Sequence, residues 1–414
     1  MVRTKRASRT DASQPLLTLF GPGHGENPFP LYARLRQAAP ATKVRLPTRQ
    51  HIWVVTRYEA VVGMLRDERF TVDPRKAGLK MPIWRRWAAR ALGMDGDSLV
   101  GVDDPEHYRL RSFVHKAFTP RTVDRLAAWT EKVTHQLLDE AARKGSVDLI
   151  ADFALPLPLT VIAELVGVPD KERQEFSALV SHLFNFASPR INIISMMASG
   201  YRLKRYLDAL IELKRRNPDD RLLSTLLAAE ESGDRLTHAE LLSMVLLLLF
   251  AGHETTVNLI GNGMLAFFDN PEQFEHLRGR PELVEQAVEE LLRFAPPVEY
   301  GVPRHAVSDV QMEDVTIPRG DRAIALLSAA NRDERIFENA DRLDVTREKN
   351  RQITFGLGLH FCLGAPLARR EGAIAFRALA QRFPNLSLDV PRGDVEWWNI
   401  AGLRGLKKLP VRLS

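Results

Sequence analysis

The stretch FGLGLHFCLG, residues 355–364, holds the single cysteine of the chain, Cys362, among three glycines and a histidine. Glycines permit backbone conformations that other residues resist. An apolar pattern of helical period follows, with Pro366 where a first helical turn tolerates proline. The sequence therefore predicts a loop that places Cys362 at a helix N-terminus, where the dipole and the free amide groups favour a thiolate.

A thiolate in such a loop is either a nucleophile or a metal ligand, whereas an ordinary buried cysteine is only a small apolar side chain. Zinc needs about four ligands, and His360 is the one other candidate nearby. The dinucleotide-binding fingerprint G-x-G-x-x-G would need a third glycine at position 361, where the chain has Phe361. A haem iron needs one protein ligand on its proximal side, and thiolate is a known choice. The residues leave open both a haem-thiolate site and a cysteine enzyme that uses His360 as its base.

The loop resembles the haem-binding signature of the cytochrome P450 family, F-x-x-G-x-x-x-C-x-G, at every fixed position: Phe355, Gly358, Cys362 and Gly364. The resemblance implies that Cys362 is the axial thiolate of haem b. It also implies a mainly α fold with a small β region (α+β), a triangular prism of about a dozen helices around a buried haem.

The segment AGHETT, residues 251–256, interrupts an expected apolar helix over 237–268 and resembles the oxygen-activation segment of the same family. By that resemblance Ala251 and Gly252 lie against the cofactor, with a gap at Gly252, and Glu254 and Thr255 relay protons. Taken alone, an acid and two threonines in a helix are typical of a local hydrogen-bonded kink.

Four basic side chains match positions that bind the haem propionates in the family. His107 and Arg111 are spaced i,i+4, which places them on one face of a helix. The other two are Arg304 and His360. Positive partners are what two partly buried carboxylates need.

The stretch ELLR, residues 290–293, contains a Glu-x-x-Arg pair. An isolated pair of this kind is usually a surface ion pair of small energetic weight. The resemblance instead gives Glu290 and Arg293 a structural role, with Arg342 as the third member from a later irregular segment.

The 414 residues are 45% hydrophobic and 27% charged, with a net charge of +6, as in ordinary globular proteins. Residues 1–15 are expected to be a disordered basic lead-in and 16–414 a single cytochrome P450 domain. We expect its β-rich parts near 42–56, 310–327 and 385–413, and its α-rich body over 57–294 and 363–382. The stretches 71–100 and 187–198 are expected to be long loops near the substrate.

The resemblance is to soluble, bacterial-type (class I) members, and it implies a monooxygenase that inserts one atom of O2 into an apolar small molecule by hydroxylation or epoxidation. Electrons would come from a ferredoxin or flavodoxin and its NAD(P)H-dependent reductase. A basic face that includes Arg109, Arg121, Arg369 and Arg370 is one candidate docking site, and ordinary solvated surface arginines are the alternative interpretation. Val298 and Ile400 are expected to line the pocket. We expect a cytoplasmic monomer that binds neither nucleic acid nor membrane.

Three alternatives remain open at this point. A haem-thiolate sensor or binding module without turnover would have no need of the proton relay at Glu254 and Thr255. A peroxide-driven peroxygenase would lack that acid–alcohol pair. A haem-free thiol hydrolase would need a base beside Cys362.

Overall fold

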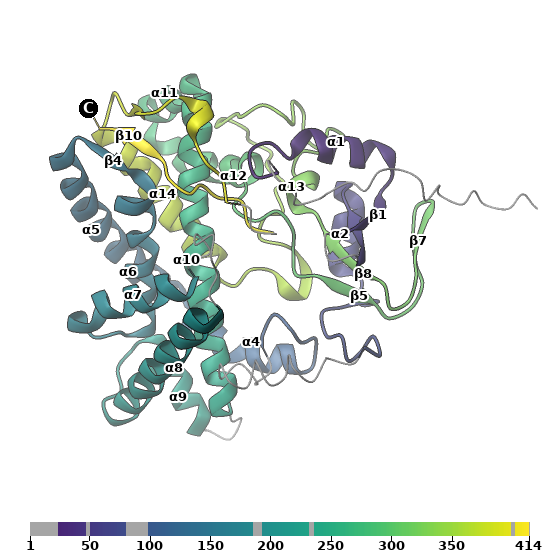
Figure 1. Cartoon of the computed structure of the whole chain (residues 1–414), viewed down its shortest axis with the longest axis horizontal. Coiled ribbons are helices and arrows are strands. Elements are labelled where there is room, and N and C mark those ends of the chain that lie inside the picture. The colour runs from purple at the N-terminus through teal and green to yellow at the C-terminus, as the bar shows by residue number, and fades with distance from the viewer. Residues whose placement is uncertain are drawn as a thin grey trace, which may run out of the picture.

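A long apolar helix, α10 (His238–Asp269), runs through the middle of the molecule (Figure 1). The computed structural model describes residues 24–46, 50–79, 98–184, 193–231, 236–398 and 402–413. A capping box starts α10, since Thr237 and Glu240 each accept a hydrogen bond from the other's backbone amide. By length and composition α10 could cross a membrane, but 61% of its most apolar window is buried inside the protein. It is therefore packed as the core helix of a globular protein.

The other helices pack around α10, and α14 (Ala365–Arg382) packs closely against it. A Cβ atom added to Gly263 of α10 would lie 2.5 Å from the ring of Phe376 in α14. One added to Gly372 of α14 would lie 3.2 Å from Leu259. Glycine at both positions fixes the separation of the two helices. The remaining helices are α1 (Phe29–Ala38), α2 (Tyr58–Arg66), α4 (Glu106–Ala117), α5 (Pro120–Lys144), η1 (Ile150–Ala154), α6 (Pro156–Val166), α7 (Arg173–Phe184), α8 (Ile193–Arg216), α9 (Leu222–Glu231), α11 (Pro271–Gly279), α12 (Val284–Phe294) and α13 (Leu327–Ala330).

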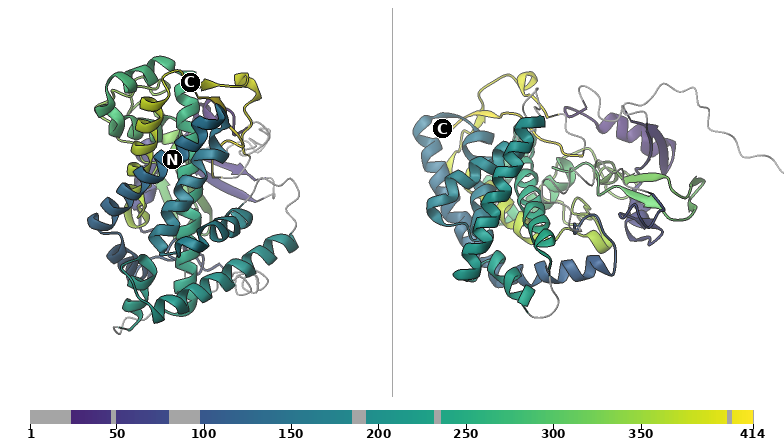
Figure 2. Two further views of the ribbon diagram at one scale, coloured as in Figure 1. Left: turned by 90° about the vertical axis from the view of Figure 1, so that its left-hand side faces the viewer. Right: turned by 60° about the horizontal axis from the view of Figure 1, so that its bottom comes forward.

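A five-stranded sheet lies on the far side of α10 from helices α5 to α8, and the views of Figure 2 agree with this separation. Its strand order is β1-β2-β8-β5-β3, with β2 and β8 parallel and the other pairs antiparallel. The strands are β1 (Ala41–Arg45), β2 (His51–Val55), β3 (Phe70–Thr71), β5 (Arg304–Ala306) and β8 (Arg322–Ala325). A second sheet has the order β4-β10-β9 (Ser146–Asp148, Pro410–Arg412, Ser387–Leu388), and β6 (Val310–Met312) forms a hairpin with β7 (Val315–Ile317).

The expected mainly α fold, with a small β region assembled from distant segments, is confirmed. Helices with strong apolar periodicity, such as α10 and α14, begin and end within about two residues of their expected bounds. The sequence analysis did not identify α1, α7, α9 and α11, nor the short strands β3, β4 and β5. Strands of two or three residues are too short for an alternating pattern to show.

Two expected loops are only partly described. Residues 80–97, which include Trp84 and Trp87, and residues 185–192 lie outside the described part of the chain, as does the lead-in 1–15. From Ile193 onward the second stretch is the start of α8, so the expectation of a loop as far as residue 198 was wrong.

Candidate functional site

The loop before α14 holds Cys362 through its own backbone. The amide of Cys362 donates to the carbonyl oxygen of Phe355 at 2.9 Å. Gly356 and Gly358 have φ angles of +69° and +70°, in the left-handed region that favours glycine. A Cβ atom at Gly358 would lie 2.8 Å from the carbonyl oxygen of Leu65 in α2. Glycine is therefore required at this contact, which presses the loop against the end of α2.

Cys362 lies just before α14, as the sequence predicts. Its sulfur accepts hydrogen bonds from the backbone amides of Gly364 and Ala365. Burial nevertheless raises the pKa of the Cys362 thiol, although those amides and the guanidinium groups of Arg111 and Arg369 act in the opposite direction. The expected contribution of the helix N-terminus is therefore present, but desolvation, which the sequence does not show, outweighs it. Such a sulfur is suited to a bound cation that replaces its proton.

His107 and His360 lie edge to face beside this loop, with ring centroids 4.5 Å apart. Burial, followed by the charges of His360 and Arg111, lowers the pKa of His107 to about 4. Nε2 of His360 is 3.5 Å from Oδ1 of Asp103. Burial acts to raise the pKa of Asp103, but the contact with His360 and a hydrogen bond from Thr71 outweigh it and the pKa is lowered. Asp103, which the sequence analysis did not single out, thus orients His360.

The two arginines of the predicted set hold backbone oxygens around the same loop. Arg111 donates to the carbonyl oxygen of Phe361 at 2.8 Å, one residue before the cysteine. Arg304 donates to the carbonyl oxygen of Leu65 at 3.0 Å. Burial lowers the pKa of both guanidinium groups. His107, Arg111, Arg304 and His360 are thereby brought together from α4, β5 and the cysteine loop.

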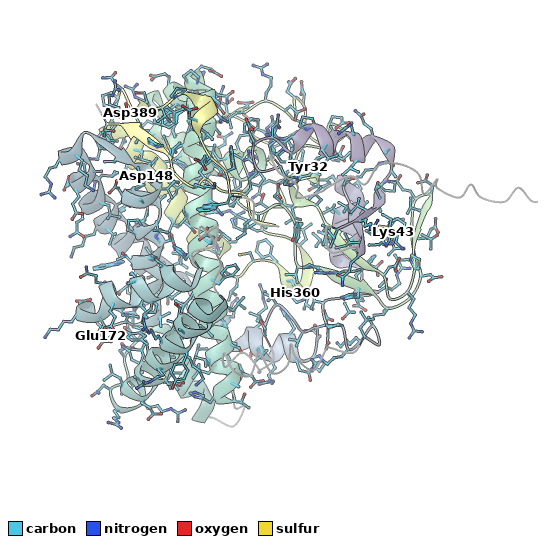
Figure 3. The ribbon with its side chains drawn as sticks, in the orientation of Figure 1. Tyr32, Lys43, Asp148, Glu172, His360 and Asp389 are labelled. Atoms are coloured by element: carbon cyan, nitrogen blue, oxygen red, sulfur yellow. The ribbon has the colours of Figure 1, made fainter. Side chains whose placement is uncertain are left out.

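Buried polar atoms that make no hydrogen bond among the described residues gather here: both ring nitrogens of His107, Nε of Arg304, and Nε2 of His360, whose 3.5 Å contact with Asp103 is an ion-pair distance only. Such atoms are costly to bury unless an acceptor meets them. Two propionate carboxylates are acceptors of the required kind. His360 lies between α10 and the five-stranded sheet (Figure 3). The donor set and the single sulfur together fit a haem.

The polar segment of α10 does not interrupt the helix, which is continuous through Gly252. The hydroxyl of Thr255 donates to the carbonyl oxygen of Ala251 at 2.6 Å, one turn earlier. A Cβ atom at Gly252 would lie 2.6 Å from Cδ1 of Ile162 in α6, so this glycine permits close helix packing. The expected gap at Gly252 was wrong, and the local hydrogen bond of the alternative interpretation is present.

Glu254 is a largely buried acid next to a buried histidine. Burial raises the pKa of Glu254 to about 7. Nδ1 of His253 lies 3.7 Å from Oε2 of Glu254, and burial lowers the pKa of His253 to about 4. An acid whose pKa is near neutrality is suited to proton exchange. The sequence analysis assigned no role to His253, because a single histidine in an apolar helix carries no signal of its own.

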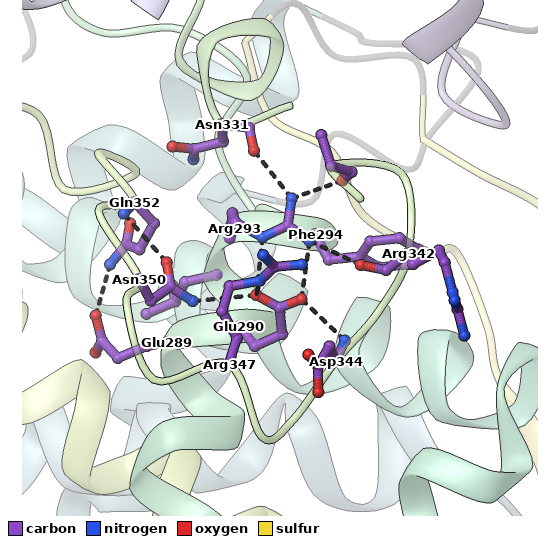
Figure 4. A network of polar contacts seen from close by, with 12 residues as sticks. Glu289, Glu290, Arg293, Phe294, Asn331, Arg342, Asp344, Arg347, Asn350 and Gln352 are labelled. Carbon is purple, nitrogen blue, oxygen red and sulfur yellow. Dashed lines mark hydrogen bonds and ion pairs between the residues drawn. The ribbon is translucent and has the colours of Figure 1, made fainter. Parts of the chain in front are cut away.

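A buried ion-pair network lies where α12 meets the segment that precedes the cysteine loop (Figure 4). Glu290 and Arg293 are fully buried and joined by two hydrogen bonds of 2.8 Å. Glu290 also accepts hydrogen bonds from Arg347 at 3.0 Å and from Asn350 at 3.1 Å. The prediction of Arg342 as third member was wrong, since Arg342 offers only its carbonyl oxygen, to Arg293, and its side chain points away.

Val298, a predicted pocket residue, forms an isolated bridge with Leu403, whereas Ile400 lies outside the described residues. Two stretches of irregular backbone, 297–299 and 402–404, are therefore paired at this place.

The arginines of the expected basic face are mostly paired within the chain. Arg109 contacts Glu240, Arg369 contacts Glu289 and Arg370 contacts Glu285. The fourth, Arg121, lines a surface hollow with Arg125 and Asp220. The positive field of this face is accordingly weaker than the sequence suggested.

Comparisons with known proteins agree on one family. Residues 47–396 match the family model described as Cytochrome P450. The chain is 40% identical to the polyketide biosynthesis cytochrome P450 PksS of Bacillus subtilis, over 96% of this chain and 99% of that protein. A solved structure of PksS superposes with a TM-score of 0.87 over 95% of this chain and 99% of that one. The monooxygenase PikC of Streptomyces venezuelae is 40% identical over 100% and 97% of the two chains. The mycinamicin IV hydroxylase/epoxidase of Micromonospora griseorubida is 37% identical over 97% and 99%.

Proposed function

The chain belongs to the cytochrome P450 family and is a haem b monooxygenase, and we propose that its substrate is an apolar polyketide-type natural product, such as a macrolide. The relatives just described support this proposal, since their names concern polyketide biosynthesis and mycinamicin IV. The reaction is RH + O2 + 2e⁻ + 2H⁺ → ROH + H2O, or the matching epoxidation of a double bond. The observation that carries it is Cys362 just before α14, beside a group of basic side chains whose buried polar atoms include several without a hydrogen bond among the described residues.

Each residue of the site has a distinct task in this proposal. When bound, thiolate-ligated haem supplies the activation of dioxygen. Cys362 supplies the thiolate, and the loop glycines hold it in place. The basic groups that would bind the propionates are His107, Arg304 and His360, with Arg111 beside them at the carbonyl oxygen of Phe361. The exposed Ala251 borders the cofactor, Gly252 seats α10 against α6, and Glu254 and Thr255 hold and pass protons at the carboxyl and hydroxyl oxygens.

Bacterial members of the family generally take electrons from a ferredoxin and its reductase. We propose here a ferredoxin or flavodoxin with an NAD(P)H-dependent reductase, acting on a monomer in the cytoplasm that binds neither nucleic acid nor membrane. The single cysteine supports a reducing compartment. Arg109, Arg369 and Arg370 are paired with carboxylates. We therefore expect the affinity for the electron carrier to depend less on salt concentration than it would if these arginines were unpaired.

A binding module without turnover and a peroxide-driven enzyme are the competing functions. Glu254 supports the monooxygenase, because burial raises its pKa to about 7 and so keeps a proton available near neutral pH. Thr255, within one turn of the exposed Ala251, supplies a hydroxyl on the same helix.

The experiment is a binding and turnover screen of the haem-loaded protein. Four ligands are titrated while the spin-state spectrum is recorded. They are mycinamicin IV, a second macrolactone that carries no sugar, myristic acid, and a steroid. Each binder is then incubated with a ferredoxin system and oxygen. We expect the macrocycles to bind most tightly and to gain one oxygen atom by mass. Preferential binding and oxidation of the fatty acid or the steroid would contradict the substrate class.

A further inference from the structure

His24 and Tyr32 contact the carboxylate of Glu299, which lies next to the proposed pocket. Glu299 follows Val298 and is 1% exposed. Its Oε1 accepts a hydrogen bond from the hydroxyl of Tyr32, in α1, at 2.8 Å. Its Oε2 lies 3.1 Å from Nε2 of His24. Tyr32 is labelled beside α1 in Figure 3, and it is completely buried.

The three side chains form a closed triangle, because the hydroxyl of Tyr32 also lies 3.0 Å from Nε2 of His24. The hydroxyl hydrogen is directed to Glu299, so we assign a hydrogen to Nε2 of His24 for both of its contacts to be favourable. Burial, and then the charge of Glu299, raises the pKa of Tyr32, so this hydroxyl stays a donor. A buried carboxylate depends on such donors.

The backbone of Glu299 belongs to the pair of irregular stretches described above. Its amide donates to the carbonyl oxygen of Gly402 at 2.9 Å, next to the bridge between Val298 and Leu403. Its own carbonyl accepts from the amide of Ser328 at 3.1 Å. Movement of the Glu299 side chain therefore acts directly on the 297–299 stretch.

The second stretch is held by the same N-terminal residues. Arg404 is 6% exposed, and its guanidinium donates to the carbonyl oxygens of Gly25 and Glu26 at 3.1 Å. Its amide donates to the carbonyl oxygen of Pro297 at 3.0 Å. The guanidinium also stacks on Trp397, 3.8 Å from the ring centroid. Residues 24–32 thus contact both stretches, one through Glu299 and the other through Arg404.

We propose that His24 and Tyr32 are positioning residues that clamp the 297–299 and 402–404 stretches and thereby set the shape of ligand that the pocket accepts. They act through Glu299, whose backbone stretch is paired with residues 402–404, and they touch neither substrate nor cofactor. The proposal rests on the proposed function in one respect, namely that these two stretches border the substrate pocket.

The first test is hydrogen–deuterium exchange of the haem-loaded protein with the change Tyr32→Phe, which removes one oxygen atom. We expect the amides of Glu299 and Arg404 to exchange about five- to ten-fold faster, as expected for the loss of one hydrogen bond. The matched control is Tyr58→Phe, since Tyr58 is also buried and its hydroxyl donates to the carbonyl oxygen of Arg351 at 2.8 Å. His24→Asn provides the same test if Tyr32→Phe does not fold. Unchanged exchange at both amides would overturn the clamp.

The second test measures ligand shape with two haem ligands of different size, imidazole and 4-phenylimidazole. We expect Tyr32→Phe to change the ratio of their dissociation constants at least three-fold, and Tyr58→Phe to leave it unchanged. Faster amide exchange with an unchanged ratio of dissociation constants would overturn the claim about ligand shape. The 297–299 and 402–404 stretches would then not border the pocket. Turnover of the wild-type protein tests the monooxygenase assignment separately, so the two failures are distinguishable.

Discussion

The Nε atom of Arg347 donates to Oε2 of Glu290 at 3.0 Å, although 57 residues separate them along the chain. The same carboxylate accepts from Arg293, Asn350 and the amide of Asp344. This network fastens α12 to the irregular segment that leads into the cysteine loop. The position of Cys362 therefore depends on contacts formed well outside the loop itself.

Glu290→Ala should lower the free energy of unfolding by about 3–5 kcal/mol, because it leaves the buried Arg293 without its anion. Urea unfolding followed by circular dichroism measures the change. Glu289→Ala is the matched control, since Glu289 lies one residue earlier and pairs with the partly exposed Arg369. Its loss should cost about 0–1 kcal/mol. Similar losses in both variants would contradict a structural role specific to Glu290.

Thr255→Ala should separate electron consumption from product formation. The hydroxyl that donates to Ala251 is removed, and we expect the rate of product formation to fall about 10²-fold while oxygen is still consumed. Product per NAD(P)H oxidised is the measurement. Thr255→Ser retains the hydroxyl and should recover most of the coupling. If both variants are equally uncoupled, the methyl group rather than the hydroxyl is what matters.

The pH dependence of product formation should report Glu254. Burial raises its pKa from 4.5 to about 7, so the carboxyl holds its proton below that pH and loses it above. Product per electron should therefore decline as the pH rises through about 7. Glu254→Gln should give a low yield with no such decline. A decline with the same midpoint in Glu254→Gln would assign the titration to another group.

Stability should also depend on pH through Glu371, a buried carboxyl of α14 that is 3% exposed. Burial raises its pKa to about 8 from 4.5 in the unfolded chain. The folded state then binds more protons than the unfolded state, so stability is full below about pH 4.5 and falls as the pH rises to about 8. Each pKa unit corresponds to about 1.4 kcal/mol.

Glu371→Gln should therefore reduce the loss of stability between about pH 6 and about pH 9. Urea unfolding midpoints at the two pH values measure it, and Glu282→Gln, at an exposed position, is the control. An equal pH dependence in wild type and Glu371→Gln would show that the carboxyl has a partner in solution.

The sequence was informative where a function depends on residues close together in the chain. The cysteine loop, the AGHETT segment and the His107–Arg111 spacing are local patterns, and each lies where it was expected. The choice between Arg342 and Arg347 depends on how an irregular segment folds back on α12, which no periodicity records.

Two further features were beyond the sequence for the same physical reason. The arginines of the basic face are paired with glutamates of other helices, and only the tertiary structure brings those charges together. The pKa of Cys362 is a balance between a local helix terminus and burial by distant segments. The local contribution was predicted correctly, but the larger contribution comes from burial.

The spectrum of the reduced, carbon monoxide-bound protein tests the central claim most directly. Wild-type protein should show the strongly red-shifted Soret band of thiolate-ligated haem. Cys362→Ser should lose that band, and Cys362→Ala provides the same comparison without a competing oxygen ligand. Haem content, measured separately, shows whether the cofactor is still bound. A wild-type protein that takes up no haem, or a Cys362→Ser spectrum identical to that of the wild type, would contradict the assignment of Cys362 as the haem ligand.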